Sequence, residues 1–451
     1  MRAFLAVFPF FHFLGEFFAM VKLVKTATEF ELSPTLAANE MVKSRRAEGK
    51  KAYHMGFGES PFPVPERLKN ALKSAVDRKE YLPTAGLPEL CETVAAYYKD
   101  KAGLDISKFD VLVAPGSKLI LYALQMAIEG DLLMPDPSWV SYKPQARMLK
   151  TAVIMVPTTL DEKGYHIDPE ELRKVIKQAR SEGKNPSKLI LNYPSNPTGL
   201  TIQEDELKAL AKVCVEEDIL IISDEIYGFV SFDGVYRTIA QYAPTHTAIT
   251  TGLSKHLSLG GWRVGVGFIP KAVDGLQSLL RNIASETWSC VPAPIQQAVI
   301  EAYKGHEDIE QHIQQCTDIH ALMNKYIAKG LRSLDIHAPE PQGAFYNYPN
   351  FEKHRAALAK SGIKTSKDLA GALLKDYSLA ALPGTAFGAE PEVLTLRLSG
   401  CDYDGQTALK AYQGGAALNE AFIEKYAPRV KESIETFERF IANISDKSKA
   451  A

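Results

Sequence analysis

The stretch TAITTGLSKHLSLGGWRVGVGF, residues 247–268, decides the fold. Two short apolar segments, 247–251 and 264–268, flank a loop that carries Lys255 and, eight positions later, Arg263. A lysine normally lies on a polar, solvated surface, but Lys255 directly follows a segment with the composition of a buried strand. Burial lowers the pKa of an amine, so a lysine at such a position can form a Schiff base.

Short apolar segments of this kind recur along the chain and alternate with amphipathic segments. Those expected to be buried strands are residues 109–114, 131–134, 152–156, 188–192, 219–223, 247–251 and 264–268. Helical periodicity is found between several of them, at residues 117–129, 169–181 and 204–217. Alternation of strands and helices predicts an α/β fold with helices layered on a sheet.

After about residue 320 the pattern changes to long helices, expected at residues 322–334, 366–374 and 422–444. This change predicts a second, smaller domain. We expect a large domain at residues 68–320 and a small α+β domain formed by residues 30–67 and 321–445.

Composition excludes several classes of protein. Of 451 residues, 46% are hydrophobic and 24% are charged, as in ordinary globular proteins. The 52 Lys and Arg residues are balanced by 54 Asp and Glu residues, so there is no basic surplus for nucleic acid. The five cysteines include no C-x-x-C pair and their number is odd, which predicts a reducing compartment and no metal site.

Residues 1–29 are expected to be an N-terminal extension. Residues 3–21 are largely apolar, but His12 and Glu16 make the run a poor membrane span. Two interpretations stay open: a targeting segment, or an extension ahead of a start at Met20 or Met41. The expected location is the cytoplasm, with targeting left open, and no membrane partner is implied by the rest of the chain.

Two loops that follow expected strands are candidate ligand sites. Gly116, Ser117 and Lys118 open a helix, whose free amides would suit a phosphate, although a simple N-cap turn explains them too. The loop 192–199, NYPSNPTG, places Asn196 at the carboxyl end of its strand, where open α/β sheets bind ligands. Asn196 either donates to a ligand or bonds only its own backbone.

Two further motifs carry charge. Asp224 ends a buried strand and is followed three residues later by Tyr227; a buried acid needs a partner, although an N-cap also explains Asp224. Residues 394–399, LTLRLS, alternate as a half-buried strand. On its own this pattern predicts an Arg397 that points outward to solvent.

Together these motifs resemble the class I (fold type I) pyridoxal-phosphate-dependent aminotransferases, the aspartate aminotransferase family, over about residues 30–415. The resemblance also includes the segments GFGE at 56–59, YLPTAGLPEL at 81–90 and PSWVSY at 137–142. It implies a three-layer sandwich around a seven-stranded, mostly parallel sheet, with pyridoxal 5'-phosphate as the cofactor and a homodimer as the active unit.

The resemblance also implies a role for each site residue. Catalysis is expected from Lys255, which bonds the cofactor, from Asp224, which pairs with its ring nitrogen, and from Tyr227, which bonds its phenolic oxygen. The expected cofactor-binding residues are Lys255, Gly116, Ser117, Lys118, Trp139, Asn196, Asp224, Tyr227, Ser254, Arg263 and, from the neighbouring subunit, Tyr81. The expected substrate-binding residues are Gly58, Trp139, Asn196 and Arg397.

The function implied is transamination between an L-amino acid and a 2-oxo acid, with 2-oxoglutarate as the expected acceptor. A lyase of the same fold, a C–S lyase or a cyclopropane-forming synthase, is the alternative because the same carbanion can expel a leaving group. A non-catalytic cofactor-binding regulator is disfavoured, because no helix-turn-helix segment with a basic face is expected before residue 30 or after residue 415. A nicotinamide dehydrogenase is disfavoured because no G-x-G-x-x-G follows the first strand. Residues 286–292, ETWSCVP, hold no arginine for a distal carboxylate, so aspartate is not singled out as the donor.

Overall fold

The computed structural model describes residues 34–162 and 164–450. The extension expected at residues 1–29 lies outside the described residues. Among the helices that are described, none is both long and apolar enough to cross a membrane. The five cysteines all carry free thiols.

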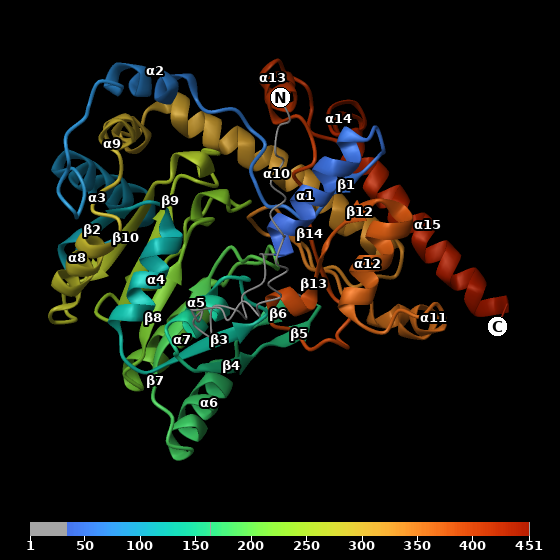
Figure 1. Ribbon diagram of the computed structural model, residues 1–451, viewed down its shortest axis with the longest axis horizontal. Helices are drawn as coiled ribbons and strands as arrows, with labels where there is room; N and C mark the ends of the chain where they lie inside the picture. Colours follow the sequence, from blue (N-terminus) through green and yellow to red (C-terminus); the bar gives the residue numbers. More distant parts are fainter. Residues whose placement is uncertain (1–33, 163, 451) are drawn as a thin grey trace, which may run out of the picture. The chain divides into compact units, whose positions relative to one another are not determined.

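A seven-stranded sheet organises the first part of the described chain (Figure 1). Its strands, in spatial order, are β2 (Phe109–Ala114), β10 (Gly265–Pro270), β9 (Thr247–Gly252), β8 (Leu220–Asp224), β7 (Pro186–Asn192), β3 (Asp131–Asp136) and β4 (Val153–Pro157). Strand β10 is antiparallel to both of its neighbours, and the other strand pairs are parallel. The predicted fold class is confirmed, because all seven predicted strands belong to one mostly parallel sheet.

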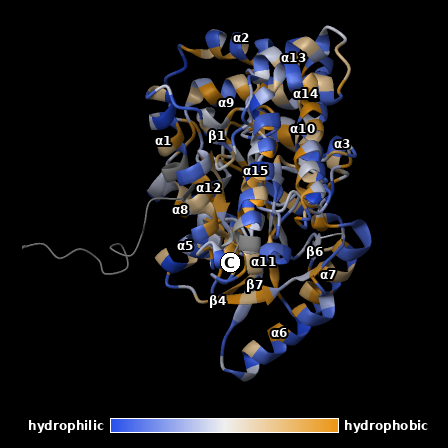
Figure 2. Cartoon of the chain, turned by 90° about the vertical axis from the view of Figure 1, so that its right-hand side faces the viewer, coloured by the Kyte–Doolittle hydropathy of each residue, from blue (hydrophilic) through white to orange (hydrophobic). Residues whose placement is uncertain are grey.

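Helices cover both faces of this sheet, which makes three layers. The helices of one face are α4 (Ser117–Ala127), α5 (Tyr142–Met148) and α8 (Leu276–Thr287), and those of the other are α3 (Pro88–Ala102), α6 (Pro169–Ser181) and α7 (Glu204–Glu216). Adjacent strand residues point to opposite faces: Leu112 packs with the first group and Val113 with the second. Figure 2 shows the corresponding mixture of hydrophobic and hydrophilic residues on α6 beside the hydrophobic strands β4 and β7.

The chain beyond the sheet packs with the start of the described chain. Strand β1 (Tyr53–His54) pairs with β12 (Leu379–Ala380), so the blue and orange segments of Figure 1 lie side by side. A second sheet has the order β11 (Tyr346–Asn347), β14 (Leu396–Ser399), β13 (Leu382–Pro383). The helices of this part are α1 (Pro34–Ala47), α10 (Glu307–Ser333), α11 (Arg355–Lys360), α12 (Ser366–Tyr377), α13 (Gly405–Gln413), α14 (Glu420–Tyr426) and α15 (Pro428–Ala450).

The remaining elements are α2 (Glu66–Ala75), which packs on α9 (Ala293–Val299), and a hairpin of β5 (Thr159–Asp161) and β6 (Gly164–His166). One apolar cluster joins Tyr53 and Phe62 to residues of α10 and α15 such as Leu331 and Phe437. This cluster agrees with a small domain made of both chain ends, but the domain boundaries stay a prediction.

Two expected helices differ from the structure. The helix expected at 322–334 begins earlier, at Glu307. Its first half was missed because the buried polar residues His312 and His320 interrupt the apolar stripe in the sequence. The helix expected at 422–444 is interrupted before Pro428, whose ring and missing amide hydrogen end α14 and start α15.

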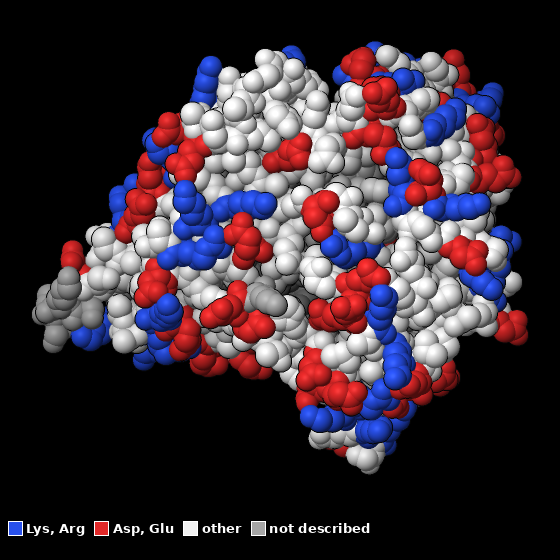
Figure 3. All heavy atoms as spheres, turned by 180° about the vertical axis from the view of Figure 1, so that it is seen from behind, with Lys and Arg blue, Asp and Glu red and all other residues white. Residues whose placement is uncertain are grey.

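On the face shown in Figure 3, basic and acidic side chains of the described residues are interspersed. This distribution agrees with the near-neutral net charge of the chain. The sheet matters most for the site: because β3, β7, β8 and β9 are parallel, their carboxyl ends meet at one edge.

Candidate active site

Lys255 lies in the loop after β9, at this edge of the sheet. Its Nζ donates a 3.1 Å hydrogen bond to the carbonyl oxygen of Gly58 and lies 5.5 Å and 5.6 Å from the ring centroids of Tyr227 and Phe345. Burial lowers the pKa of the Lys255 amine to about 8. In residues 34–162 and 164–450, no carboxylate forms an ion pair with it, so this amine is available for bonding to a carbonyl carbon.

Asp224 is the last residue of β8 and is 3% exposed. Its Oδ2 accepts a 2.7 Å hydrogen bond from the Tyr142 hydroxyl, and its Oδ1 accepts one of 3.3 Å from the hydroxyl of Thr250. Burial raises the pKa of the Asp224 carboxyl to about 6, although these hydrogen bonds oppose the shift. Near neutral pH the carboxylate is therefore a buried charge that favours a cationic partner.

Tyr227 is 2% exposed, and its hydroxyl oxygen lies 2.8 Å from that of Tyr346. Burial raises the pKa of the Tyr227 phenol well above its usual value, so it stays a proton donor. Sequence reasoning missed both Tyr142 and Tyr346. The segment 137–142 drew attention to the first without giving it a role, and no local pattern marked the second.

Arg397 lies in β14 and is only 2% exposed, so the outward arginine that the alternating pattern suggested is wrong. All four residues of β14 are buried, so neither face of the strand is exposed to solvent. The guanidinium donates to the Asn196 Oδ1 at 3.3 Å and to the carbonyl oxygen of Gly56 at 2.6 Å. The rings of Tyr346 and Phe387 lie 4.6 Å and 5.2 Å from its central carbon.

The charge of Arg397 is not compensated. Its Nε has no hydrogen-bond partner, and no carboxylate in the described part of the chain forms an ion pair with it. A buried, unpaired guanidinium is costly and presents a planar pair of donors, which matches a carboxylate. The contact with Arg397 shows that the Asn196 side chain reaches beyond its own loop, and its contact with a ligand stays a prediction.

A second candidate anion site lies at the start of α4. Gly116 precedes the helix with a positive φ of 91°, and as a glycine it provides no side-chain cap for the first amides. The backbones approach closely here: a Cβ added to Gly265 would lie 2.2 Å from the Ser117 nitrogen. The Arg263 guanidinium lies close to Gly116, so uncapped helix amides and a cation lie side by side, an arrangement that suits a phosphate.

The remaining predicted residues have fewer contacts with the rest of the site. Lys118 lies in the first turn of α4 with its Nζ 4.9 Å from the ring centroid of Trp139, and Ser254 precedes Lys255 in the same loop. Gly58 contacts Lys255 because its carbonyl oxygen accepts the hydrogen bond from the Lys255 Nζ. Tyr81 is 92% exposed, and within the described chain its hydroxyl forms no hydrogen bond.

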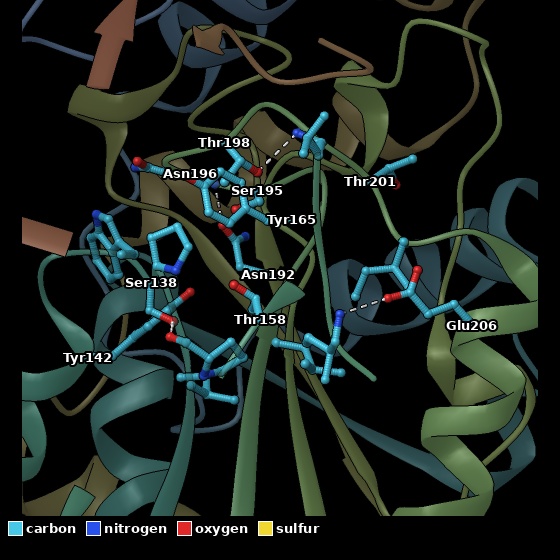
Figure 4. Close-up of a pocket in the computed structure, with 18 residues that line it drawn as sticks. Ser138, Tyr142, Thr158, Tyr165, Asn192, Ser195, Asn196, Thr198, Thr201 and Glu206 are labelled. Atoms are coloured by element: carbon cyan, nitrogen blue, oxygen red, sulfur yellow. Dashed lines mark hydrogen bonds between the residues drawn. The ribbon is translucent and has the colours of Figure 1, made fainter. Parts of the chain in front are cut away.

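A cavity of about 60 Å³ lies beside these groups at the carboxyl ends of β3 and β7 (Figure 4). Its lining includes Trp139, Tyr142, Asn196, Thr158 and Glu206. In Figure 4, Tyr142 and Glu206 lie on opposite sides, with Thr158 between them. The space therefore continues from the site residues toward the start of α7.

The groups brought together fit the cofactor that the sequence motifs imply. Pyridoxal 5'-phosphate has an aldehyde, a basic ring nitrogen and a phosphate. The amine of Lys255, whose pKa is lowered, the buried carboxylate of Asp224 and the uncapped start of α4 match these three groups in turn.

Comparison with known proteins agrees with this match. The family model described as aminotransferase class I and II matches residues 51–408. The aspartate aminotransferase of Geobacillus stearothermophilus is 33% identical over 382 residues, 83% of this chain and 93% of that protein. The asparagine–oxo-acid transaminase of Streptococcus mutans is 31% identical over 385 residues, 83% and 94% of the two chains.

Solved structures give the same assignment. The structure of an aspartate aminotransferase from Thermus thermophilus with maleate superposes with a TM-score of 0.78 at 26% identity, covering 93% of this chain and 100% of that one. The predicted reaction class and cofactor are thereby confirmed. The chain belongs to the class I and II aminotransferases and is a transaminase that depends on pyridoxal phosphate.

Proposed function

We propose that the enzyme transfers the amino group of a small L-amino acid, with aspartate or asparagine the first candidates, to 2-oxoglutarate by a ping-pong mechanism. The observation that carries the proposal is the buried, unpaired Arg397 guanidinium, which lies in contact with Asn196. The names of the relatives, aspartate aminotransferase and asparagine–oxo-acid transaminase, support the choice of donor.

The residues act on the substrate and the bound cofactor in distinct ways. When bound, pyridoxal phosphate supplies an electron sink for the pair left at the substrate Cα. Asp224 would hold a proton on the ring nitrogen, and Tyr227 would donate to the phenolic oxygen. Lys255 would bond the cofactor, and its free amine would accept the proton from the substrate Cα as a general base. A pKa of about 8 leaves part of this amine unprotonated near neutral pH.

Other residues would hold the cofactor and orient the substrate. Gly116, Ser117, Lys118, Ser254 and Arg263 would bind the phosphate, and Trp139 would lie against the ring. Arg397, with Asn196 and Gly58, would clamp the substrate α-carboxylate and so fix which Cα bond faces the base. Residues 286–292 offer no guanidinium for a distal carboxylate, which is why the donor needs a direct assay.

We also propose a homodimer with shared sites. Tyr81 is 92% exposed in the isolated chain, although it lies in the segment 81–90 that carries the family resemblance. A large exposed aromatic side chain is typical of a residue that is buried against a partner. In this proposal Tyr81 reaches the phosphate bound by the other subunit.

A donor panel tests the proposal. The holoenzyme is incubated with each amino acid and 2-oxoglutarate, and the 2-oxo acid formed is identified. We expect glutamate and the matching oxo acid in equal amounts, with the highest kcat/KM for aspartate or asparagine. Steady release of ammonia without an acceptor would instead support the lyase alternative, and activity with none of the donors would contradict the proposal.

A further inference from the structure

Tyr346 contacts the two functional halves of the site at once. Its ring faces the Arg397 guanidinium at 4.6 Å, and its hydroxyl lies 2.8 Å from the hydroxyl of Tyr227. The side chain is 1% exposed. The same residue therefore contacts the arginine assigned to the substrate carboxylate and the phenol assigned to the cofactor oxygen.

The backbone around Gly58 fixes the position of this hydroxyl. A Cβ added to Gly58 would lie 1.9 Å from the Tyr346 Oη, so only glycine allows the phenol to lie here. The carbonyl oxygen of Gly58 accepts the hydrogen bond from Lys255. Tyr346 is thus held between the segment that supports Lys255 and the Tyr227 phenol.

The direction of the hydrogen bond follows from counting protons. A phenol donates one proton and can accept others. When Tyr227 donates to the phenolic oxygen of the cofactor, its own oxygen is left to accept from Tyr346. Two hydrogen bonds in series polarise each other, so the Tyr346 hydroxyl strengthens the donation by Tyr227.

We propose that Tyr346 is a positioning residue for transamination: its hydroxyl directs the Tyr227 proton toward the cofactor, and its ring holds the Arg397 guanidinium in place. The proposal rests on the roles proposed above for Tyr227 and Arg397. It predicts that the two functions of Tyr346 can be separated, because one belongs to the oxygen and the other to the ring.

The test uses three variants of the holoenzyme. Tyr346→Phe removes only the hydroxyl, and Tyr346→Leu removes the ring as well. Tyr348→Phe is the matched control, since Tyr348 is equally buried in the neighbouring segment but its hydroxyl accepts from Thr395 and not from Tyr227. Two readouts are taken: the pH midpoint of the visible absorbance of the bound cofactor, and the dissociation constant of maleate as a dicarboxylate probe.

For Tyr346→Phe we expect the absorbance midpoint to rise by about 0.5 to 1 pH unit, because weaker donation by Tyr227 makes the protonated chromophore more stable. Its maleate affinity should stay within about twofold of wild type, since the ring remains. For Tyr346→Leu we expect the same rise and a roughly tenfold loss of maleate affinity. Tyr348→Phe should change neither quantity.

An unchanged midpoint in Tyr346→Phe would overturn the role of the hydroxyl, and so would an equal rise in Tyr348→Phe. Wild-type maleate affinity in Tyr346→Leu would overturn the role of the ring. If Tyr346→Leu does not fold, Tyr346→Phe still decides the hydroxyl, and a loss of maleate affinity in that variant would contradict the separation. Each failure would leave wild-type transamination, and hence the proposed function, untouched.

Discussion

The Tyr142 hydroxyl donates a 2.7 Å hydrogen bond to the Oδ2 of Asp224, 82 residues later in the chain. Tyr142 is 1% exposed at the start of α5, and its ring packs edge-on against Trp139 with centroids 5.2 Å apart. The residue therefore joins the carboxylate expected under the ring nitrogen to the indole expected against the ring face. Its hydrogen bond favours the ionised form of Asp224 and opposes the effect of burial.

Tyr142→Phe should weaken cofactor binding. Without the hydroxyl, the pKa of Asp224 rises above about 6, and less of the carboxylate is ionised near neutral pH. We expect the affinity of the cofactor-free protein for pyridoxal phosphate to fall about tenfold at pH 7, as is typical for loss of a hydrogen bond to a charged group. Absorbance titrations from pH 6 to 9 measure this affinity, and a curve equal to that of wild type would contradict the role of Tyr142.

A second buried acid, Glu225, follows Asp224 directly. Its carboxylate is 1% exposed and accepts hydrogen bonds from four hydroxyl groups, those of Tyr193, Ser223, Tyr236 and Thr238. No cation in the described part of the chain forms an ion pair with it. Burial raises the pKa of Glu225 from 4.5 to about 7.

This shift makes the stability of the cofactor-free protein depend on pH. Because the folded pKa lies above the unfolded one, the stabilisation by protonated Glu225 is complete below pH 4.5 and is lost as pH rises through 7. Glu225→Gln should remove roughly 3 kcal/mol of this decline between pH 4.5 and 7. Urea unfolding at several pH values measures it, and an equally steep decline in the variant would show that Glu225 is not its source.

Arg397→Lys should raise KM for the amino donor and lower kcat together. An ammonium retains the charge but cannot make the planar, two-point contact with a carboxylate that aligns the Cα bond. We expect kcat/KM to fall by at least 100-fold, about 3 kcal/mol, while the cofactor stays bound. Steady-state kinetics with the preferred donor provide the measurement. Kinetics like those of wild type would mean that the unpaired guanidinium serves another ligand.

Mixing subunits tests whether the sites are shared. If Tyr81→Ala and Lys255→Ala homodimers are each nearly inactive, a heterodimer of the two should regain up to about half of wild-type activity. One of its sites carries both defects, and the other receives Tyr81 from the Lys255→Ala chain and is intact. Proven heterodimers without activity would overturn the shared site and leave the chemistry of Lys255 unaffected.

The fold and the charged candidate site residues could be predicted from the sequence because both depend on local patterns. Apolar segments of four to six residues marked all seven strands of the sheet, and polar residues directly after them, such as Asp224, marked its functional edge. Residues Tyr142 and Tyr346 escaped because their partners lie 82 and 119 positions away. A tyrosine in an apolar segment looks like any other core residue until the fold brings an acid or a phenol to its hydroxyl.

For Arg397, the local sequence pattern gave a wrong prediction of exposure. Alternation along residues 394–399 predicts a strand with one solvent-exposed face. In the structure, β14 is the middle strand of a small sheet, and all four of its residues are buried. Only the packing of Tyr346 and Phe387 around the guanidinium distinguishes this arginine from a surface one. The proposed role of Arg397 comes from the family resemblance, and its buried, unpaired guanidinium supports that proposal.

The most direct test of the central claim is a single turnover without an acceptor. The holoenzyme is mixed with excess L-aspartate, and oxaloacetate and ammonia are measured together. We predict one equivalent of oxo acid per subunit and no ammonia, with turnover resuming only when 2-oxoglutarate is added, and no oxo acid at all from Lys255→Ala. Continuous ammonia release from the wild-type enzyme, or a full equivalent of oxo acid from Lys255→Ala, would contradict a transaminase that works through Lys255.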